Sequence, residues 1–361
     1  MKNRLSSIIG LLAALTAGAY AQVPPTTSGG FAVPQPGHEF SFPRDHGAHP
    51  EFKLEWWYLT GHLYAKDGRR FGYQATFFRN AAPDKSTDIY LAHMTLTDVK
   101  TGGFHEQERL NRAGWDAGSA ADKLDVHNGP WSLRMTNVAT NRMELHGGVR
   151  AEARFALKLE PAKPLVIFGD NGVSRKGAEP TAASYYLTFP RLRTEGTLTL
   201  NEETFAVTGE TWMDHEISSS QLGANQVGWD WAGIQFTDGR EIMFYRLRLR
   251  DGSADAASSL TWVDSASRTK KSSFKWEVLT RWKSPSTGAD YPVRVRITTT
   301  DPATQKETVF ILEPLAQNQE LAGRLGGIPY WEGACRVLAA DGRVIGSAYL
   351  ELTGYAKDLK L

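Results

Sequence analysis

The chain has 361 residues, of which 41% are hydrophobic and 22% charged, so disordered and collagen-like classes are excluded and a sizeable core is possible. Lysine and arginine number 41 against 40 aspartate and glutamate, and the formal charge of +1 argues against a nucleic-acid partner, which needs a concentrated positive field. The single cysteine, Cys335, excludes an intramolecular disulfide and a thiolate zinc site.

The first 21 residues have the pattern of a secretory signal peptide. Lys2 and Arg4 precede an apolar run, and Ala19 and Ala21 place small residues at the positions that specify cleavage. The run is shorter than the roughly 20 residues that a membrane-spanning helix needs. We therefore expect cleavage between Ala21 and Gln22, a periplasmic or secreted protein, and no membrane span after cleavage.

Residues 22–50 are rich in proline, glycine and serine, so we expect a leader that lies along the surface. His46 and His49 in this leader have a spacing compatible with a metal, but no third ligand is identifiable, and we interpret them as surface histidines. From Glu51 onward, short runs of aromatic and β-branched residues alternate with Gly, Asp and Asn, which is typical of antiparallel strands and turns. The expected fold class is all-β.

Three stretches repeat the pattern of a strand, an Asp-Gly-Arg turn and a second strand. The turns lie at residues 67–69, 238–240 and 341–343, where glycine permits the positive φ of a tight reversal. The first two turns are 171 residues apart, which suggests that one β unit occurs twice. Chance recurrence is the alternative, because Asp-Gly is a common hairpin sequence. A loop-like seam at residues 217–227 separates the two expected units.

The expected organisation is thus a signal peptide (1–21), a leader (22–50), an N-terminal domain (51–217) and a C-terminal domain (218–361). The chain has no glycine-rich phosphate loop, dinucleotide fingerprint, serine nucleophile elbow or zinc-protease motif. Nucleotide-dependent enzymes, the common hydrolases and the common proteases are therefore not indicated, and we expect no metal site.

Tryptophans occur in pairs along the expected strands. Trp229 and Trp231 are two residues apart and therefore share one face, while Asp230 points to the opposite face. Core packing is one explanation of the aromatic residues, and the lining of a cavity for an apolar ligand is the other. His93, a single histidine in a semi-apolar strand, is either a core histidine with satisfied hydrogen bonds or a catalytic residue.

The densest polar cluster is Asp214-His215-Glu216. Strand alternation puts Asp214 and Glu216 on one side and His215 on the other. Such groups supply a proton donor and a water-orienting base when their pKa values are moved toward neutrality. The alternative is an exposed polar strand end.

Ordered motifs extend over about residues 50 to 356. They are Glu55–Tyr58 with Gly61-His62, Ala92-His93 with Asp98, Trp212–Glu216 with Ser218–Ser220, Gly228–Trp231, Tyr330–Gly333 and Tyr349–Tyr355. Together they resemble the AttH-like and carotenoid 1,2-hydratase (hydroxyneurosporene synthase) family. The resemblance implies two consecutive lipocalin-like antiparallel β-barrel domains.

For the hydratases of this family, the resemblance implies protonation of a C=C bond by a buried acid and attack of water on the resulting cation, with no cofactor. Asp214, His215 and Glu216 would then be catalytic. The expected ligand-binding residues are Trp57, His93, Trp229, Trp231, Tyr245 and Trp331. Ile217 stands where the carotenoid hydratases have an aromatic residue, which argues against carotenoid as the substrate.

We therefore expect an exported protein that binds an apolar, isoprenoid- or polyketide-like molecule and has hydratase-type activity as a hydro-lyase. The alternative is a non-catalytic periplasmic carrier that hands a lipid-like ligand to an ABC exporter. The export signal favours this second hypothesis.

Overall fold

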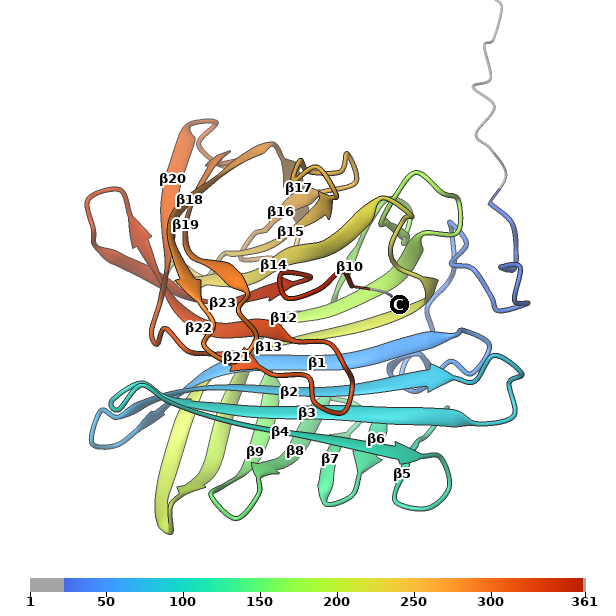
Figure 1. Ribbon diagram of the computed structural model, residues 1–361, viewed down its shortest axis with the longest axis horizontal. Coiled ribbons are helices and arrows are strands. Elements are labelled where there is room, and N and C mark those ends of the chain that lie inside the picture. Colours follow the sequence, from blue (N-terminus) through green and yellow to red (C-terminus); the bar gives the residue numbers. More distant parts are fainter. Residues whose placement is uncertain (1–22, 360–361) are drawn as a thin grey trace, which may run out of the picture.

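The structure is a computed structural model that describes residues 23–359, so the expected signal peptide lies outside the described residues (Figure 1). The described chain forms strands β1–β23 and one short 3-10 turn, η1 (Arg44–His46). Two curled antiparallel sheets follow each other along the chain, which confirms the predicted all-β fold of two consecutive barrels. Within this part of the chain, no helix has the length and apolar character needed to cross a membrane.

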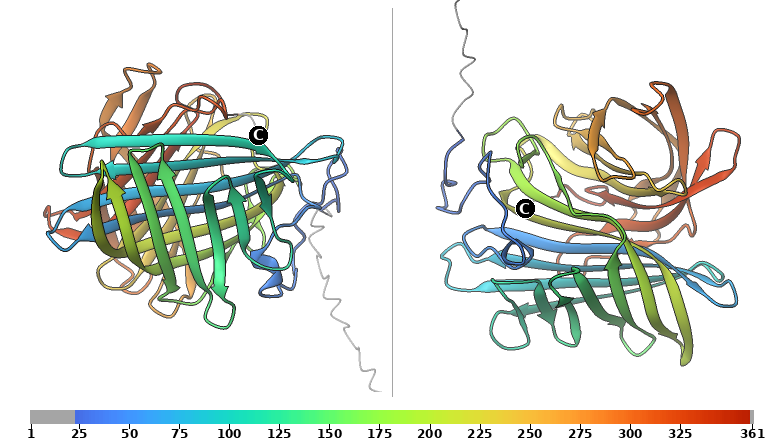
Figure 2. Two further views of the ribbon diagram at one scale, coloured as in Figure 1. Left: turned by 90° about the horizontal axis from the view of Figure 1, so that it is seen from below. Right: turned by 180° about the vertical axis from the view of Figure 1, so that it is seen from behind.

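The first sheet has thirteen strands in the order β4-β3-β2-β1-β13-β12-β9-β8-β7-β6-β5, with β10 and β11 paired to β12. Their bounds are β1 (Leu54–Ala65), β2 (Arg70–Ala81), β3 (Asp88–Asp98), β4 (Gly103–Arg112), β5 (Ala117–Ser119), β6 (Asp125–Asn128), β7 (Trp131–Asn137), β8 (Arg142–Val149), β9 (Ala153–Pro161), β10 (Val166–Phe168), β11 (Ser174–Arg175), β12 (Ala183–Leu200) and β13 (Glu203–Ser220). Figure 2 shows how β5–β9 fold back across β1–β4 and enclose a core.

The second sheet has ten strands in the order β17-β16-β15-β14-β23-β22-β20-β19-β18, with β21 paired to β22. Their bounds are β14 (Gln226–Phe236), β15 (Glu241–Leu249), β16 (Ser259–Val263), β17 (Thr269–Ser272), β18 (Phe274–Lys283), β19 (Asp290–Thr300), β20 (Glu307–Pro314), β21 (Glu320–Leu321), β22 (Tyr330–Ala339) and β23 (Val344–Thr353). This sheet curls around a separate core.

The two sheets share one strand order. In each, four consecutive strands are followed by the last two strands of the unit, so β1 lies beside β13 as β14 lies beside β23. The Asp-Gly-Arg turns join β1 to β2, β14 to β15 and β22 to β23, and their glycines have φ of 84°, 83° and 85°. The chain passes between the sheets after Ser220 and before Gln226, so the expected boundary at residues 217/218 falls inside β13.

The expectation that the leader lies on the surface is wrong for its final residues. His46 and His49, interpreted above as surface histidines, are 3% and 4% exposed. Trp57 Nε1 donates a hydrogen bond to the His46 carbonyl at 3.1 Å, which ties η1 to the first sheet. Local polarity indicated exposure, but the sheet supplies partners that offset the burial of these polar groups.

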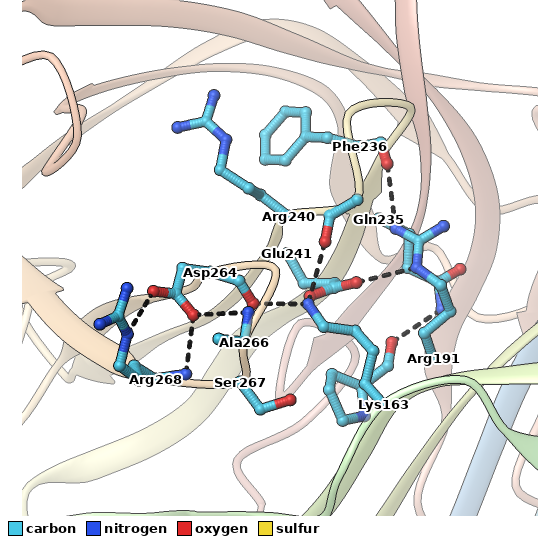
Figure 3. Close-up of polar contacts among 12 residues, drawn as sticks. Lys163, Arg191, Gln235, Phe236, Arg240, Glu241, Asp264, Ala266, Ser267 and Arg268 are labelled. Atoms are coloured by element: carbon cyan, nitrogen blue, oxygen red, sulfur yellow. Dashed lines mark hydrogen bonds and ion pairs between the residues drawn. The ribbon is translucent and has the colours of Figure 1, made fainter.

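A buried ion network joins the two sheets (Figure 3). Arg191 of β12 donates from Nε to Glu241 Oε1 of β15 at 2.8 Å, and Lys163, which follows β9, pairs with the other carboxylate oxygen. Lys163 also donates to the Gly239 carbonyl at 2.9 Å, and Arg191 donates to the Phe236 carbonyl at 2.9 Å. These contacts fix the first sheet against the β14–β15 hairpin of the second.

Candidate functional site

The face of the first sheet that meets the second carries two rows of side chains. Residues paired across antiparallel strands project to the same side, so each row runs across β12, β13, β1, β2, β3 and β4. One row is Thr188, Asp214, Tyr58, Thr76, His93 and Glu108; the other is Tyr186, Glu216, Trp56, Phe78, Leu91 and Leu110. The rows combine carboxyl groups with aromatic and aliphatic surface.

The opposing face of the second sheet is built in the same way. Its central row is Glu332, Glu351, Trp231 and Tyr245, from β22, β23, β14 and β15. A cavity of about 420 Å³ lies between the two faces, within the range of small-molecule sites. Leu325, Gly326 and Ile328 of the β21–β22 loop complete its wall. The site is therefore between the two sheets.

Asp214 lines the cavity and accepts three hydrogen bonds. Tyr186 OH donates to Oδ2 at 2.7 Å, Trp212 Nε1 donates to Oδ1 at 2.8 Å, and Thr188 Oγ1 also donates to Oδ1. Burial raises the pKa of Asp214 to about 7, although the three donors act in the opposite direction. The carboxyl group can therefore gain or lose a proton near neutral pH.

Glu351 is a second cavity carboxyl group, which was not among the expected site residues. Trp229 Nε1 donates to its Oε2 at 2.9 Å, and no described residue donates to its other oxygen. Burial raises the pKa of Glu351 to about 7, with smaller contributions from the charges of Glu216 and Asp214. Glu351 is two residues from Tyr349 in the sequence, so strand alternation places the two side chains on one face. Alternation alone does not say which face of this strand meets the other sheet.

Glu216 is paired with a lysine. Its Oε2 lies 3.0 Å from Lys176 Nζ and also accepts hydrogen bonds from Ser184 Oγ and Gln221 Nε2. The Lys176 ammonium lies 4.5 Å and 4.6 Å from the ring centroids of Tyr186 and Tyr245. These contacts hold a cation against aromatic rings inside the cavity.

The opposite end of the cavity carries a second polar group. His93 Nδ1 lies 2.8 Å from Tyr330 OH, and Gln74 Nε2 donates to the same hydroxyl at 3.1 Å. His93 Nε2 lies 3.2 Å from Glu108 Oε1, an ion-pair distance without hydrogen-bond alignment. Glu108 also accepts from the Leu325 backbone N–H at 2.9 Å and so holds the β21–β22 loop.

Glu332 belongs to the central row of the second sheet but lies behind the residues that line the cavity. It is fully buried, Tyr58 OH donates to its Oε1 at 2.7 Å, and its Oε2 has no partner among the described residues. Burial, and then the charge of Glu351 on the neighbouring strand, raise the pKa of Glu332 well above its ordinary value. Burial therefore favours the neutral, protonated form of this carboxyl group.

The expected site residues divide between the two faces of the strands. Asp214, Glu216, His93, Trp229, Trp231 and Tyr245 line the cavity. Trp57 and Trp331 instead pack in the cores of the first and second sheets. His215 also faces away from the cavity, as alternation predicts, and stacks on Trp57 with ring centroids 4.9 Å apart.

His215 belongs to a buried network with His49, Glu55 and Arg79. Glu55 Oε1 lies 2.9 Å from His49 Nδ1 and 2.7 Å from His215 Nε2, and its Oε2 accepts from Arg79 Nε at 3.1 Å. Burial acts to raise the pKa of Glu55, but the hydrogen bonds from the two histidines lower it. The network positions the leader against the sheet.

The same network contains the ligand atoms of a possible metal site. One atom each from His49, Glu55 and His215 lie within 4.8 Å of one another. Glu55 Oε1 already forms hydrogen bonds with both histidines, and Arg79 places a positive guanidinium beside the carboxylate. The hydrogen bonds account for the cluster without a metal ion.

Comparison with known proteins places this geometry in a family. The sequence model of the AttH-like family matches residues 33–355. A solved structure of a Nitrosomonas europaea protein described as AttH is 33% identical, with 90% of this chain and 100% of that chain covered and a TM-score of 0.81. No protein with a curated description gives a significant match.

Two more distant structures share the fold. Kievitone hydratase from Nectria haematococca is 14% identical, with 92% of this chain and 96% of that chain covered and a TM-score of 0.68. The structure of CghA with Sch210972 is 12% identical, with 92% and 98% covered and a TM-score of 0.54. At these identities the likeness establishes the architecture of two successive barrels.

Proposed function

Because the chain belongs to the AttH-like family, we propose that it is a hydro-lyase that adds water to a C=C bond of an apolar molecule bound between its two sheets. One observation carries the proposal. Asp214 and Glu351 are buried carboxyl groups whose pKa values are raised to about 7, and both line a cavity walled by aromatic rings. A carboxylic acid that keeps its proton near pH 7 is the group that alkene protonation requires.

The hydrogen bonds support different roles for the two carboxyl groups in this proposal. Glu351 has one oxygen without a donor, so it delivers its proton to one alkene carbon and leaves a cation on the other. The rings of Trp229, Trp231 and Tyr58 stabilise that cation. Water forms a C–O bond to the cationic carbon and loses a proton to the Asp214 carboxylate. The three hydrogen-bond donors stabilise the ionised form of Asp214. Exchange with solvent restores both groups, and no cofactor takes part.

The size and lining of the cavity support a particular ligand class. About 420 Å³ bounded by Trp56, Phe78, Leu91 and Leu247 suits an isoprenoid- or polyketide-like body. At the far end of the cavity, the Tyr330 hydroxyl and the His93 imidazole would form hydrogen bonds with an oxygen-containing group of the ligand. The shared fold of a hydratase, kievitone hydratase, supports the reaction class.

Paired variants test the proposal. Mass spectrometry of small molecules that co-purify with the protein identifies the ligand, and turnover of that ligand is then measured by chromatography. We expect Glu351→Gln and Asp214→Asn each to reduce turnover by about 10²- to 10⁴-fold, because each amide removes a proton-transfer group. The matched control is Glu277→Gln on an exposed carboxylate. Undiminished turnover in both cavity variants would refute the assignment.

A carrier function is the second candidate, and the aromatic cavity would serve it equally well. We also propose export, because of the pattern of residues 1–21, and an ABC exporter would be the partner of such a carrier. Fractionation and N-terminal sequencing of the mature protein test export. A carrier returns its ligand unchanged after incubation, whereas a hydrated product excludes a purely carrying role.

A further inference from the structure

The cavity has an excess of acidic groups. Asp214, Glu216, Glu332 and Glu351 face it or lie directly behind it, and the basic group among them is Lys176. Lys176 Nζ lies 3.0 Å from Glu216 and is thereby paired. Asp214 and Glu351 have hydrogen-bond donors but no cationic partner among the described residues.

The other titratable groups on the cavity wall do not correct this imbalance. His93 is engaged with Tyr330 and Glu108 at the far end. Glu55 directs its carboxylate away from the cavity, toward Arg79 and the histidines of the leader network. The wall near Asp214 and Glu351 therefore has two carboxyl groups without a counter-ion.

Aromatic rings surround the same region. They are Trp56, Tyr58, Tyr186, Trp229, Trp231 and Tyr245. The protein already binds one cation in this way, since Lys176 Nζ sits 4.5 Å from the Tyr186 centroid and 4.6 Å from that of Tyr245. Trp229, which donates to Glu351, and Trp231 offer the same combination of ring and carboxylate without an ammonium group.

We propose that the cavity binds hydrophobic organic ammonium ions, with the cationic group beside Glu351 and Trp229 and the apolar body against Phe78 and Leu91. Aromatic rings attract quaternary ammonium groups through the ring quadrupole, and a carboxylate adds direct charge attraction in a site that excludes water. This binding does not require the hydration reaction.

The proposal predicts a characteristic pH dependence. An ammonium ion favours the ionised forms of Asp214 and Glu351, so its binding releases protons near pH 7 and strengthens between pH 6 and pH 8. Glu216 is paired with Lys176, and burial raises the pKa of Glu332 as it raises those of Asp214 and Glu351, so neither group reverses this direction. A neutral ligand of the same shape shows no such strengthening.

The experiment compares benzyltrimethylammonium with its neutral isostere, neopentylbenzene, by isothermal titration calorimetry at pH 6 and pH 8. We expect the ammonium to bind about tenfold more tightly than the isostere at pH 8, with a smaller preference at pH 6. At pH 7, the measured enthalpy of ammonium binding should vary with the ionisation enthalpy of the buffer, which reports the released proton. Equal affinities at pH 8 would overturn the proposal.

The variant Glu351→Gln should reduce the ammonium preference several-fold and leave the affinity for neopentylbenzene unchanged. The retained neutral affinity shows that the variant is folded, and Glu277→Gln is the exposed control. An unchanged preference in a variant that still binds the isostere would overturn the assignment to Glu351. If the protein prefers the ammonium ion but produces no hydrated product, the proposed function is refuted and this inference stands. If it produces a hydrated product but shows no ammonium preference, this inference is refuted and the proposed function stands.

A stable ammonium ligand and a carbocation formed during hydration both present a positive charge to the carboxyl groups and aromatic rings of the site. Mass spectrometry of the extracted ligand distinguishes them, because the first carries a fixed positive charge and the second is recovered as a neutral alkene and its hydrated partner. Recovery of an organic anion instead would contradict the charge assignment.

Discussion

Asp214 and Glu351 have similar pKa values but different hydrogen-bond environments, which support the different roles proposed for them. Three donors surround the oxygens of Asp214, whereas Glu351 receives one hydrogen bond, from Trp229. Hydrogen bonds to the charged form stabilise a carboxylate, so the environment of Asp214 suits a base and that of Glu351 suits an acid.

The pH profile of turnover follows from these values. Burial raises the pKa of Glu351 to about 7, so the protonated donor is abundant below pH 7 and is lost as the pH rises through 7. We expect turnover to fall by about tenfold for each pH unit above 7, and to fall again below 7 as Asp214, the proposed base, becomes protonated. Initial rates between pH 5 and pH 9 measure this profile, and a rate that rises steadily to pH 9 would contradict proton donation by a carboxyl group.

His215 is predicted to support stability rather than chemistry. The variant His215→Phe keeps a ring against Trp57 but removes the hydrogen bond to the buried carboxylate of Glu55. We expect a loss of about 1–3 kcal/mol in the free energy of unfolding, measured by urea denaturation, with unchanged ligand affinity. His146→Phe, on an exposed residue, is the control. Reduced ligand affinity without reduced stability would place His215 in the site.

At the scale of strands and turns, local patterns were sufficient for some predictions. The Asp-Gly-Arg turns form hairpins because their glycines adopt positive φ, which is a property of neighbouring residues. Alternation likewise separates Asp214 and Glu216 from His215, and Trp229 and Trp231 from Asp230. Such predictions need no knowledge of how distant strands pair.

Other features depend on long-range pairing and were not predictable. Trp56 and Trp57 are adjacent and equally aromatic, but Trp56 lines the cavity and Trp57 fills a core. Glu351 enters the site because β23 pairs with β14, which places it opposite Trp231. His46 and His49 are buried because a sheet formed by later residues covers them.

The crossing of β2 and β22 requires a glycine. A Cβ atom on Gly72 would lie 2.5 Å from Ala334 Cβ and 2.9 Å from Tyr349 OH. We expect Gly72→Ala to lower the free energy of unfolding by about 1–3 kcal/mol, because the two sheets must separate locally. Gly29→Ala, whose Cβ would meet nothing nearer than 3.5 Å, is the control in the same urea titration. Equal stability of the two variants would refute this account of the crossing.

At the scale of the molecule, the cavity lies between the sheets because the interior of each curled sheet is already filled by its own core. Trp57, Phe77 and Phe155 belong to the first core, and Trp331 and Phe310 to the second. The two faces that meet must therefore stay in fixed register for Asp214 and Glu351 to share one cavity. The network around Glu241 supports this register.

Loss of that network should destabilise the whole chain. Glu241→Gln leaves Lys163 and Arg191 buried without their shared carboxylate, and we expect a loss of about 3–5 kcal/mol in the free energy of unfolding. Calorimetric melting measures the effect, with Glu203→Gln on an exposed ion pair as the control. A melting temperature equal to that of the control would show that the two sheets are held by other contacts.

The most direct test of the central claim is incubation of the co-purified ligand with the protein in heavy-oxygen water, followed by mass spectrometry. The account predicts a product heavier by one molecule of labelled water, with the heavy oxygen on carbon, and no such product from a variant that combines Glu351→Gln and Asp214→Asn. Recovery of the ligand without label from the unaltered protein would contradict hydration. Equal labelling by the double variant would contradict the assigned site.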